Sequence, residues 1–203
     1  KFGIYDQSFK NQSIISKLKI NIFEPEQIYL NLYKKKIYSI SKINPNNTAM
    51  IFFTSGSTSD PKGVAISYKS FVYSALQQIR NLDYKKNREV FSDYHDNSFV
   101  MSLNIIFPAM YLASSIAPIT DYFDKINPVD HLKKNNITVL ITVPSFFLYI
   151  KNFIKKRLKI KKIIFCGETL SLNILKMCTK KINFKNLYNC YGATELSPWV
   201  YFY

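Results

Sequence analysis

The most informative stretch of this sequence is Ala49-Met50-Ile51-Phe52-Phe53-Thr54-Ser55-Gly56-Ser57-Thr58-Ser59-Asp60-Pro61-Lys62-Gly63-Val64-Ala65-Ile66. An apolar strand is expected to enter a loop of hydroxyl residues, and a second apolar strand to leave it. Hydroxyls and backbone N–H groups donate to phosphate oxygens, glycines allow close approach of the backbone, and Lys62 adds a positive charge. The composition therefore predicts a loop that binds a polyphosphate.

Two alternative interpretations of the loop fit less well. An ordinary Ser/Gly-rich hairpin turn accounts for the serines and glycines but not for a lysine that follows a rigid proline. A Walker A loop shares the spacing from Gly56 to Gly63, but Pro61 replaces its second glycine and Gly63 its Mg²⁺-binding Ser/Thr. The sequence after the loop also begins as a strand, so no helix N-terminus faces the phosphates. We therefore exclude a P-loop NTPase.

The composition indicates a folded domain with a basic charge. The chain has 203 residues, 47% of them apolar and 16% aromatic, which is enough to bury a core. Its 28 Lys and Arg against 13 Asp and Glu give a net charge of +15. The lysines are spread along the chain, and arginine is too scarce for bidentate recognition of phosphate or guanine. A nucleic-acid-binding domain would need clustered arginines and exposed aromatics, so we expect no nucleic-acid partner.

The cysteines and the longest uncharged segment indicate the cellular compartment and whether the chain spans a membrane. Cys166, Cys178 and Cys190 lack C-x-x-C spacing, so we expect reduced, partly buried thiols in a cytoplasmic protein. Residues 98–120 carry no charge and are long enough to span a bilayer. Asn104, Pro108 and two serines interrupt them, so we expect a helix that Pro108 ends, then a buried strand at 115–119, and no membrane span.

Strands and helices alternate in the second half of the chain. A helix is expected from its cap Asn127, with Pro128 first, to Lys134. Further strands are expected at 138–143, 162–166 and 187–191, and further helices at 145–154 and 171–180. Short links between them predict an α/β fold, a mainly parallel sheet with flanking helices. Such sheets bind ligands outside the carboxyl ends of their strands, here at 142–145, 166–169 and 191–195.

The first part of the chain is less informative. Residues 1–47 form a leading segment with weak sequence signals. Within it, a helix is expected at 13–18 and strands at 20–23 and 36–40. Residues 48–203 are expected to form the nucleotide-binding part, in which Ser67 caps a helix that runs to Leu82.

Four segments together resemble a known superfamily. Thr54 to Val64 follows the phosphate-loop pattern Thr-Ser-Gly-Ser-Thr-Gly-x-Pro-Lys-Gly-Val of the adenylate-forming (AMP-binding) enzymes, with Ser59 in place of one glycine. Thr142 to Ser145 resembles their Pro-Ser turn, Gly167 to Leu170 their Gly-Glu-x-Leu segment, and Asn189 to Glu195 their Asn-x-Tyr-Gly-x-Thr-Glu motif. The superfamily includes acyl-CoA synthetases, amino-acid adenylation domains and D-alanine:carrier protein ligases. The matches occur in the family's order from Thr48 onward.

The resemblance implies a Mg·ATP site. Tyr191 would stack on adenine, and Gly167 would line the purine with its backbone. Thr194 would bond the α-phosphate and Glu195 would hold Mg²⁺, and these two residues and Lys62 would form the catalytic set. The β- and γ-phosphates would be held by Thr54, Ser55, Ser57, Thr58 and Lys62. Further nucleotide contacts would come from Gly56, Gly63, Glu168 and Gly192. An aromatic face, a hydroxyl and a hard oxygen ligand at neighbouring strand ends suit Mg·ATP.

The reaction implied is attack by a carboxylate on the α-phosphate of ATP, which gives an acyl-adenylate and pyrophosphate. The thiol of coenzyme A or of a carrier protein's pantetheine arm then takes the acyl group. The family's ribose-binding aspartate, hinge and small C-terminal domain have no counterpart before Tyr203. We therefore expect a fragment of the large N-terminal domain that is catalytically incomplete alone, or else a nucleotide-binding remnant.

Residues 94–98 indicate which class of acid the protein activates. Asp96 and Ser98 match the Phe-Asp-x-Ser segment whose aspartate anchors a substrate ammonium group, whereas Tyr94-His95 matches the Phe-His motif of acyl-CoA synthetases. A carboxylate that faces an apolar pocket is costly unless a cation joins it. Asp96 can instead cap the following helix. We expect Asp96 and His95 to contact the substrate, an amino acid, with a fatty or aryl acid as the alternative.

Overall fold

The computed structural model describes residues 2–4, 21–23, 42–54, 60–119, 121–196 and 201–202. The chain divides into two units, Lys1–Ile43 and Asn44–Tyr203. In the first unit, β1 (Phe2–Ile4) and β2 (Asn21–Phe23) form a parallel pair, so the strand expected at 20–23 is found. The helix expected at 13–18 and the strand expected at 36–40 lie outside the described residues.

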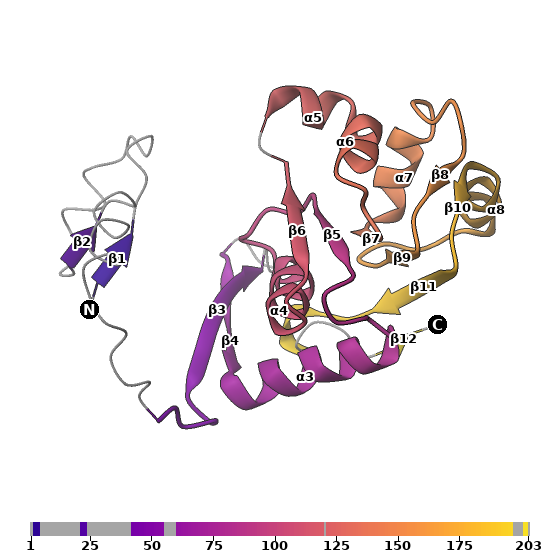
Figure 1. Cartoon of the computed structure of the whole chain (residues 1–203). Helices are drawn as coiled ribbons and strands as arrows, with labels where there is room; N and C mark the ends of the chain where they lie inside the picture. Colours follow the sequence, from indigo (N-terminus) through magenta and orange to yellow (C-terminus); the bar gives the residue numbers. More distant parts are fainter. Residues whose placement is uncertain are drawn as a thin grey trace. The chain divides into compact units, whose positions relative to one another are not determined.

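The second unit is built on a parallel sheet with the strand order β12-β11-β9-β7-β5-β6 (Figure 1). Neighbouring strands from β6 to β11 run parallel, and β12 runs antiparallel to β11. The strands are β5 (Val90–Asp93), β6 (Ser115–Pro118), β7 (Val139–Thr142), β9 (Lys162–Phe165), β11 (Asn186–Tyr191) and β12 (Tyr201–Phe202). The predicted α/β fold with a mainly parallel sheet is confirmed.

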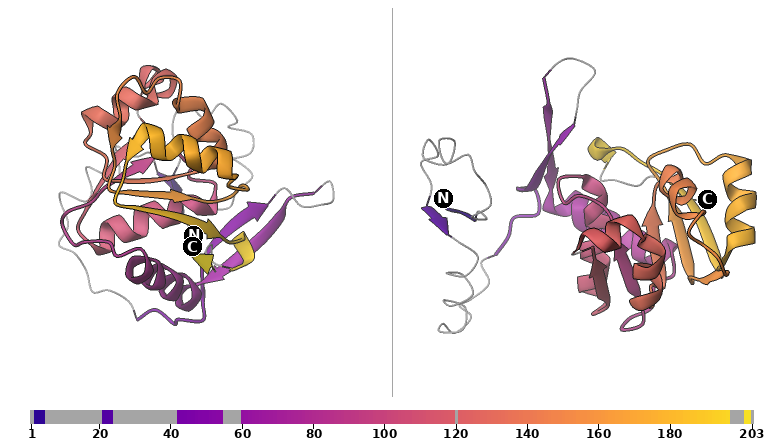
Figure 2. Two further views of the ribbon diagram at one scale, coloured as in Figure 1. Left: turned by 90° about the vertical axis from the view of Figure 1, so that its right-hand side faces the viewer. Right: turned by 90° about the horizontal axis from the view of Figure 1, so that it is seen from above.

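Helices cover both faces of this sheet (Figure 2). The core on one face includes residues of α3 (Tyr68–Asn81) and α4 (Leu103–Tyr111), and the core on the other face includes residues of α6 (Pro128–Lys134), α7 (Pro144–Ile150) and α8 (Leu172–Lys181). Strand β7 shows the alternation, because Val139 and Ile141 belong to the first core and Leu140 to the second. The short α5 (Tyr122–Ile126) precedes α6.

Outside this sheet, β3 (Thr48–Thr54) and β4 (Lys62–Ser67) form an antiparallel hairpin. The side chain of Ser67 then caps α3, where its Oγ accepts a hydrogen bond from the N–H of Ser70 at 3.2 Å. The predicted pair of strands around the loop and the predicted Ser67 cap are confirmed. Farther along, β8 (Leu158–Lys159) and β10 (Ile182–Asn183) add a two-stranded parallel pair.

The prediction that Pro108 ends a helix is wrong, because α4 continues through it to Tyr111. Proline lacks the N–H that would bond the carbonyl four residues earlier, here that of Asn104. Gln78 of α3 supplies the missing donor: its Nε2 donates to the Asn104 carbonyl at 2.8 Å, and both residues are buried. A tertiary hydrogen bond thus replaces the intrahelical one, and the strand predicted after it is found as β6. No helix among the described residues is long and apolar enough to cross a membrane.

Three other elements differ in detail from expectation. Strand β5 was not predicted, and α7 ends at Ile150 instead of reaching residue 154, since the chain turns there toward β8. Asn127 precedes Pro128 and α6 as predicted, but it makes no side-chain cap bond. Its Nδ2 donates instead to the carboxylate of Asp130.

A buried ion pair joins three strands at their amino ends. The carboxylate of Glu89 lies 3.2 Å from Lys162 Nζ and accepts a hydrogen bond from Thr138 Oγ1 at 2.7 Å. Glu89 is 2% exposed and Lys162 6% exposed. Lys162 also donates to the carbonyl of Asp83 at 2.8 Å. Burial raises the pKa of the Glu89 carboxyl, but the Thr138 hydroxyl and Lys162 outweigh it and hold this pKa below its ordinary value of 4.5.

Replacing Glu89 tests this network. Glu89→Gln leaves the Lys162 ammonium buried without its counter-charge, so we expect a loss of about 3 kcal/mol in the free energy of unfolding at pH 7. Because the folded-state pKa of Glu89 is lowered, its stabilisation is full above about pH 4.5 and is lost as the pH falls through the folded-state pKa. Urea denaturation of both proteins between pH 3 and pH 7, roughly the range in which carboxyl groups titrate, measures the difference.

Lys161 provides the matched control. Its Nζ lies 3.9 Å from the same carboxylate, but its side chain is 54% exposed, so Lys161→Gln should cost less than about 1 kcal/mol. Equal losses for the two variants would contradict a specific buried pair.

Candidate nucleotide-binding site

The hairpin of β3 and β4 frames the predicted phosphate loop. Thr54 and Lys62 face each other across its open end in the strand register, and Lys62 is exposed. The predicted contacts Ser55, Gly56, Ser57 and Thr58 lie outside the described residues. The structure therefore places the two ends of the predicted phosphate loop, a hydroxyl and a lysine, next to each other.

Gly63 has a second constraint that sequence reasoning did not give. It lies within β4, directly opposite Phe53. A Cβ at this position would come within 3.3 Å of Ile51 Cγ2 and 3.4 Å of Phe53 Cε1. The glycine therefore makes room for two large side chains on the neighbouring strand, in addition to the close approach to phosphate that the sequence predicts.

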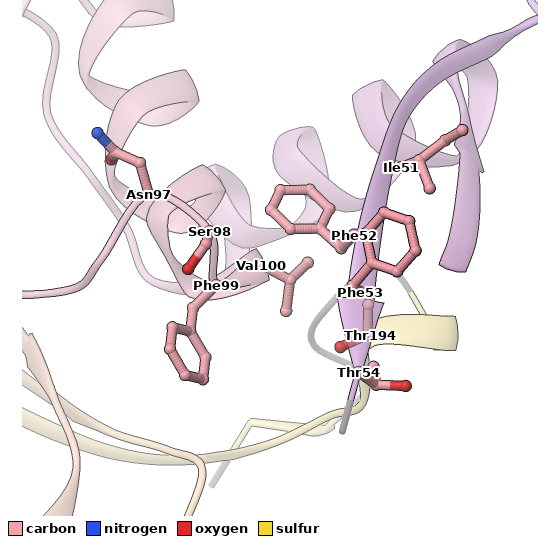
Figure 3. A pocket seen from close by; sticks show the side chains of 9 residues that line it. All are labelled: Ile51, Phe52, Phe53, Thr54, Asn97, Ser98, Phe99, Val100 and Thr194. Carbon is pink, nitrogen blue, oxygen red and sulfur yellow. The ribbon is translucent and has the colours of Figure 1, made fainter. Parts of the chain in front are cut away.

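A groove of about 780 Å³ runs beside this hairpin (Figure 3). Thr54 of β3 and Thr194 both line it. Thr194 begins the short helix η2 (Thr194–Leu196), which contacts β4. The two predicted phosphate-binding threonines thus come from segments far apart in the sequence. The other lining residues are mainly apolar side chains of β3 and residues of the segment before α4: Ile51, Phe52, Phe53, Asn97, Ser98, Phe99 and Val100.

Tyr191 and Glu195, which lie three residues before and one residue after Thr194, both have exposed side chains. Tyr191 ends β11 and is 63% exposed, so its ring is open to a stacking partner. Glu195 on η2 is exposed and makes no ion pair with the described residues. The part of the chain that the structure describes contains no group of three side chains that could hold a metal alone. A single carboxylate suits Mg²⁺ that takes its other ligands from phosphates and water.

The ends of β7 and β9 contact each other. After β9 the chain turns at Gly167, whose φ is +78°, in the left-handed region that favours glycine. A Cβ there would lie 3.4 Å from Val143 Cγ1. The carboxylate of Glu168 accepts two hydrogen bonds from Ser145, from its N–H at 2.9 Å and from its Oγ at 2.7 Å. The predicted contacts Gly167 and Glu168 are therefore held against the end of β7.

Asp96 and His95 line a second cavity, of about 410 Å³, at the carboxyl end of β5. The Asp96 carboxylate is exposed and accepts the N–H of Ser98 at 2.8 Å, which lowers its pKa. Burial lowers the pKa of His95, and its Nε2 lies 3.2 Å from the Ile141 carbonyl oxygen. Asp96 thus bonds the backbone within the turn before the 3₁₀ helix η1 (Val100–Ser102). The helix cap of the alternative hypothesis is not found, because the N-cap residue of η1 is Phe99 and neither η1 nor α4 has a side-chain cap bond.

Sequence reasoning missed Asp93, which lines the same cavity. Burial raises the pKa of its carboxyl, and its Oδ1 is buried without a hydrogen-bond partner among the described residues. Its signal is its position at the end of β5, a strand that was itself not predicted.

The three cysteines are buried free thiols, as expected. Burial raises the pKa of Cys178 and of Cys190 to about 12. Cys166 and Cys190 directly precede Gly167 and Tyr191 and belong to the core beneath α3 and α4. Neutral thiols of this kind act as small apolar side chains under the predicted nucleotide site.

Comparisons with known proteins agree with this arrangement. The family model of the AMP-binding enzyme matches residues 6–203. A plipastatin synthase chain of Bacillus subtilis (strain 168) is 29% identical over 171 residues, which cover 81% of this chain and 7% of that protein. The D-alanine–D-alanyl carrier protein ligase of Staphylococcus aureus (strain JH9) is 27% identical over 210 residues, which cover 98% of this chain and 40% of the ligase.

Solved structures share the fold. O-succinylbenzoate coenzyme A synthetase from Bacillus subtilis, in complex with ATP and magnesium ion, superposes with a TM-score of 0.76 at 18% identity over 100% of this chain and 41% of that one. The Vibrio cholerae adenylation domain AlmE, in complex with glycyl-adenosine-5'-phosphate, gives 0.73 at 19% identity over 100% and 38%. The chain spans about 40% of the length of these proteins. It belongs to the family of AMP-binding enzymes, the adenylate-forming ligases.

Proposed function

We propose that this chain supplies the Mg·ATP-binding part of a ligase that adenylates a carboxylic acid and passes it to a thiol. The observation that carries the proposal is that Thr54 and Thr194, predicted to bind different phosphates, line one groove. Lys62 stands opposite Thr54, and Tyr191 offers an exposed ring. A site for a phosphate chain and a base needs hydroxyl donors, a cation and an aromatic face in this kind of proximity.

Each residue has a distinct part in the proposed reaction. Lys62, with the loop 55–58, holds the β- and γ-phosphates and neutralises charge as pyrophosphate leaves. Thr194 donates to the α-phosphate, where the substrate carboxylate attacks. Positioning and charge neutralisation suffice for such a displacement, so the chain needs no general base at this step.

Glu195 is the proposed magnesium ligand, assisted by phosphate oxygens. Its exposed carboxylate is a hard oxygen donor, and no described cation neutralises it. When bound, the ion supplies positive charge to the phosphate oxygens. The Bacillus subtilis synthetase of the same fold is described with ATP and magnesium ion, which supports this choice of cofactors.

Two variants separate the metal ligand from the phosphate-binding lysine. Glu195→Gln should weaken binding of ATP about tenfold, a change of about 1.4 kcal/mol, and added Mg²⁺ should partly restore it because an amide oxygen still coordinates. Lys62→Ala should weaken binding as much but respond to Mg²⁺ as the unchanged protein does. Calorimetric titration of ATP at several Mg²⁺ concentrations measures both. Equal Mg²⁺ responses of the two variants would contradict the division of roles, and no ATP binding by the natural full-length protein would reject the site.

We further propose that the acid is an amino acid. Asp96 is exposed in the cavity beside the predicted nucleotide site, and the backbone N–H of Ser98 keeps its pKa low, so it is available as an anion for an ammonium group. The relatives named for D-alanine and the structure that contains a glycyl adenylate support an amino acid. His95 has a lowered pKa and would face the substrate uncharged. A fatty or aryl acid is the alternative, supported by the likeness to a coenzyme A synthetase.

Pyrophosphate exchange tests the substrate class. With the natural full-length protein we expect exchange with amino acids and not with fatty or aryl acids of similar size. Asp96→Asn should reduce exchange with the best amino acid at least about tenfold through a higher KM, because the substrate ammonium would lose its counter-charge. Exchange only with acids that lack an amino group, or full activity of Asp96→Asn, would reject the proposed anchor.

The acceptor and the setting follow from the same proposal. A carrier protein's pantetheine thiol suits an amino-acid ligase, and coenzyme A suits the alternative. Such a reaction draws on the ATP of the cytoplasm, where we place the protein. A nucleotide-binding remnant without catalysis predicts ATP binding but no exchange with any acid.

A further inference from the structure

Glu168 and Ser145 form a clamp between the ends of β9 and β7. Both oxygens of the Glu168 carboxylate are engaged, Oε1 by the Ser145 hydroxyl at 2.7 Å and Oε2 by the Ser145 N–H at 2.9 Å. The residues are 23 positions apart in the sequence, and both lie at the surface. A two-point contact of this kind fixes orientation as well as distance.

The clamp provides the hydrogen-bond acceptor that the N-terminus of α7 lacks. Its N-cap residue, Val143, has no side-chain acceptor, and Pro144 has no N–H. The N–H of Ser145 is therefore the first free donor of the helix. Helix caps normally come from a Ser, Thr, Asp or Asn just before the helix. Here the acceptor comes from the neighbouring strand end, so capping α7 also ties the two strand ends together.

Gly167 lies between the two contacts that join these ends. On one side the position of its missing Cβ faces Val143 Cγ1 at 3.4 Å, and on the other side Glu168 is bonded to Ser145. Its φ is +78°, and because glycine adopts positive and negative φ about equally well, its own preferences do not fix this conformation. The orientation of the Gly167 peptide therefore depends on contacts made by its neighbours.

We propose that Glu168 is a positioning residue that holds the Gly167 backbone for the purine through Ser145, without touching the nucleotide. The inference rests on the proposed function, which assigns Gly167 to the purine. This role replaces the direct nucleotide contact that the resemblance implies for Glu168: both carboxylate oxygens are directed to donors of Ser145, and a carboxylate repels the phosphates of ATP. Because the pair is exposed, its variants are expected to remain folded.

Three variants distinguish positioning from direct contact. Glu168→Ala removes both hydrogen bonds and should raise the Kd of ATP about tenfold. Glu168→Gln keeps an acceptor for the Ser145 N–H and gains an amide donor for its Oγ, so the Kd should stay within about threefold of the unchanged protein. Ser145→Ala should give part of the loss, and Ser145→Ala with Glu168→Ala should be no worse than Glu168→Ala alone. Calorimetric titration of ATP with Mg²⁺ supplies these values.

Hydrogen exchange gives a second readout, independent of nucleotide. The Ser145 amide should exchange faster in Glu168→Ala than in the unchanged protein, and Glu168→Gln should restore its protection. Ser171→Ala is the matched control. It removes the cap of α8 in the same connection, where Ser171 Oγ accepts the N–H of Ile174 at 3.3 Å, but it leaves the clamp intact. Its Kd for ATP should not change.

The outcomes separate the two claims. If the unchanged protein fails to bind ATP, both the proposed function and this inference are rejected. If it binds, three results reject the inference alone: an unaltered Kd in Glu168→Ala, equal losses in Glu168→Gln and Glu168→Ala, or additive losses in the double variant. Equal losses in Glu168→Gln and Glu168→Ala would mean that the carboxylate charge itself matters to the nucleotide, and additive losses would mean that Glu168 acts independently of Ser145.

Discussion

The register of the central strands depends on the buried charge pair at their amino ends. β5 and β7 are joined in the strand register at Phe91 and Val139. Glu89, just before β5, accepts from Thr138, just before β7, and pairs with Lys162, the first residue of β9. The Thr138 hydroxyl also accepts the N–H of Val90 at 2.8 Å. Charged side chains buried at these positions tolerate no slip, because any shift would leave a charge without a partner in a dry environment.

Because the parallel strands begin in register at one edge of the sheet, their carboxyl ends lie together at the opposite edge. The predicted site residues of these strands therefore come together there. At that edge, Asp93 and Tyr191 are the last residues of β5 and β11, and Ser145 and Gly167 come shortly after β7 and β9. The phosphate loop is the exception, because its hairpin is not part of this sheet. Its connection runs through η2, which carries Thr194 and contacts β4. The proposed α-phosphate ligand is thus on the element that links the hairpin to the sheet edge.

The sequence was sufficient for the fold class and for most elements that carry strong periodic or capping signals. β7 and β9 are mainly apolar and completely buried, and Ser67 and Ser171 are N-caps at the starts of α3 and α8. β5 was missed because charged residues precede it and half of its side chains are polar, although Ser92 is fully buried. The error at Pro108 has a tertiary cause, since the donor that rescues the helix comes from Gln78, 26 positions away from the carbonyl that it reaches. Local propensity carries no information about such a partner.

The difference between local signals and tertiary partners also applies to the site. Residues within a motif can be predicted from their own segment, whereas the residues that support the motif cannot. Thr54 and Lys62 follow from the composition of one short loop, and Gly167 and Tyr191 from the resemblance of their segments to motifs of the family. Ser145 cannot be assigned a supporting role from its own segment, because its partner belongs to another strand end. The two edges of the sheet also differ in how they are held. The amino edge is fixed by buried charges, whereas the carboxyl edge is joined by exposed hydrogen bonds that contribute little to global stability. The buried pair that stabilises the fold therefore lies at the opposite edge of the sheet from the predicted site.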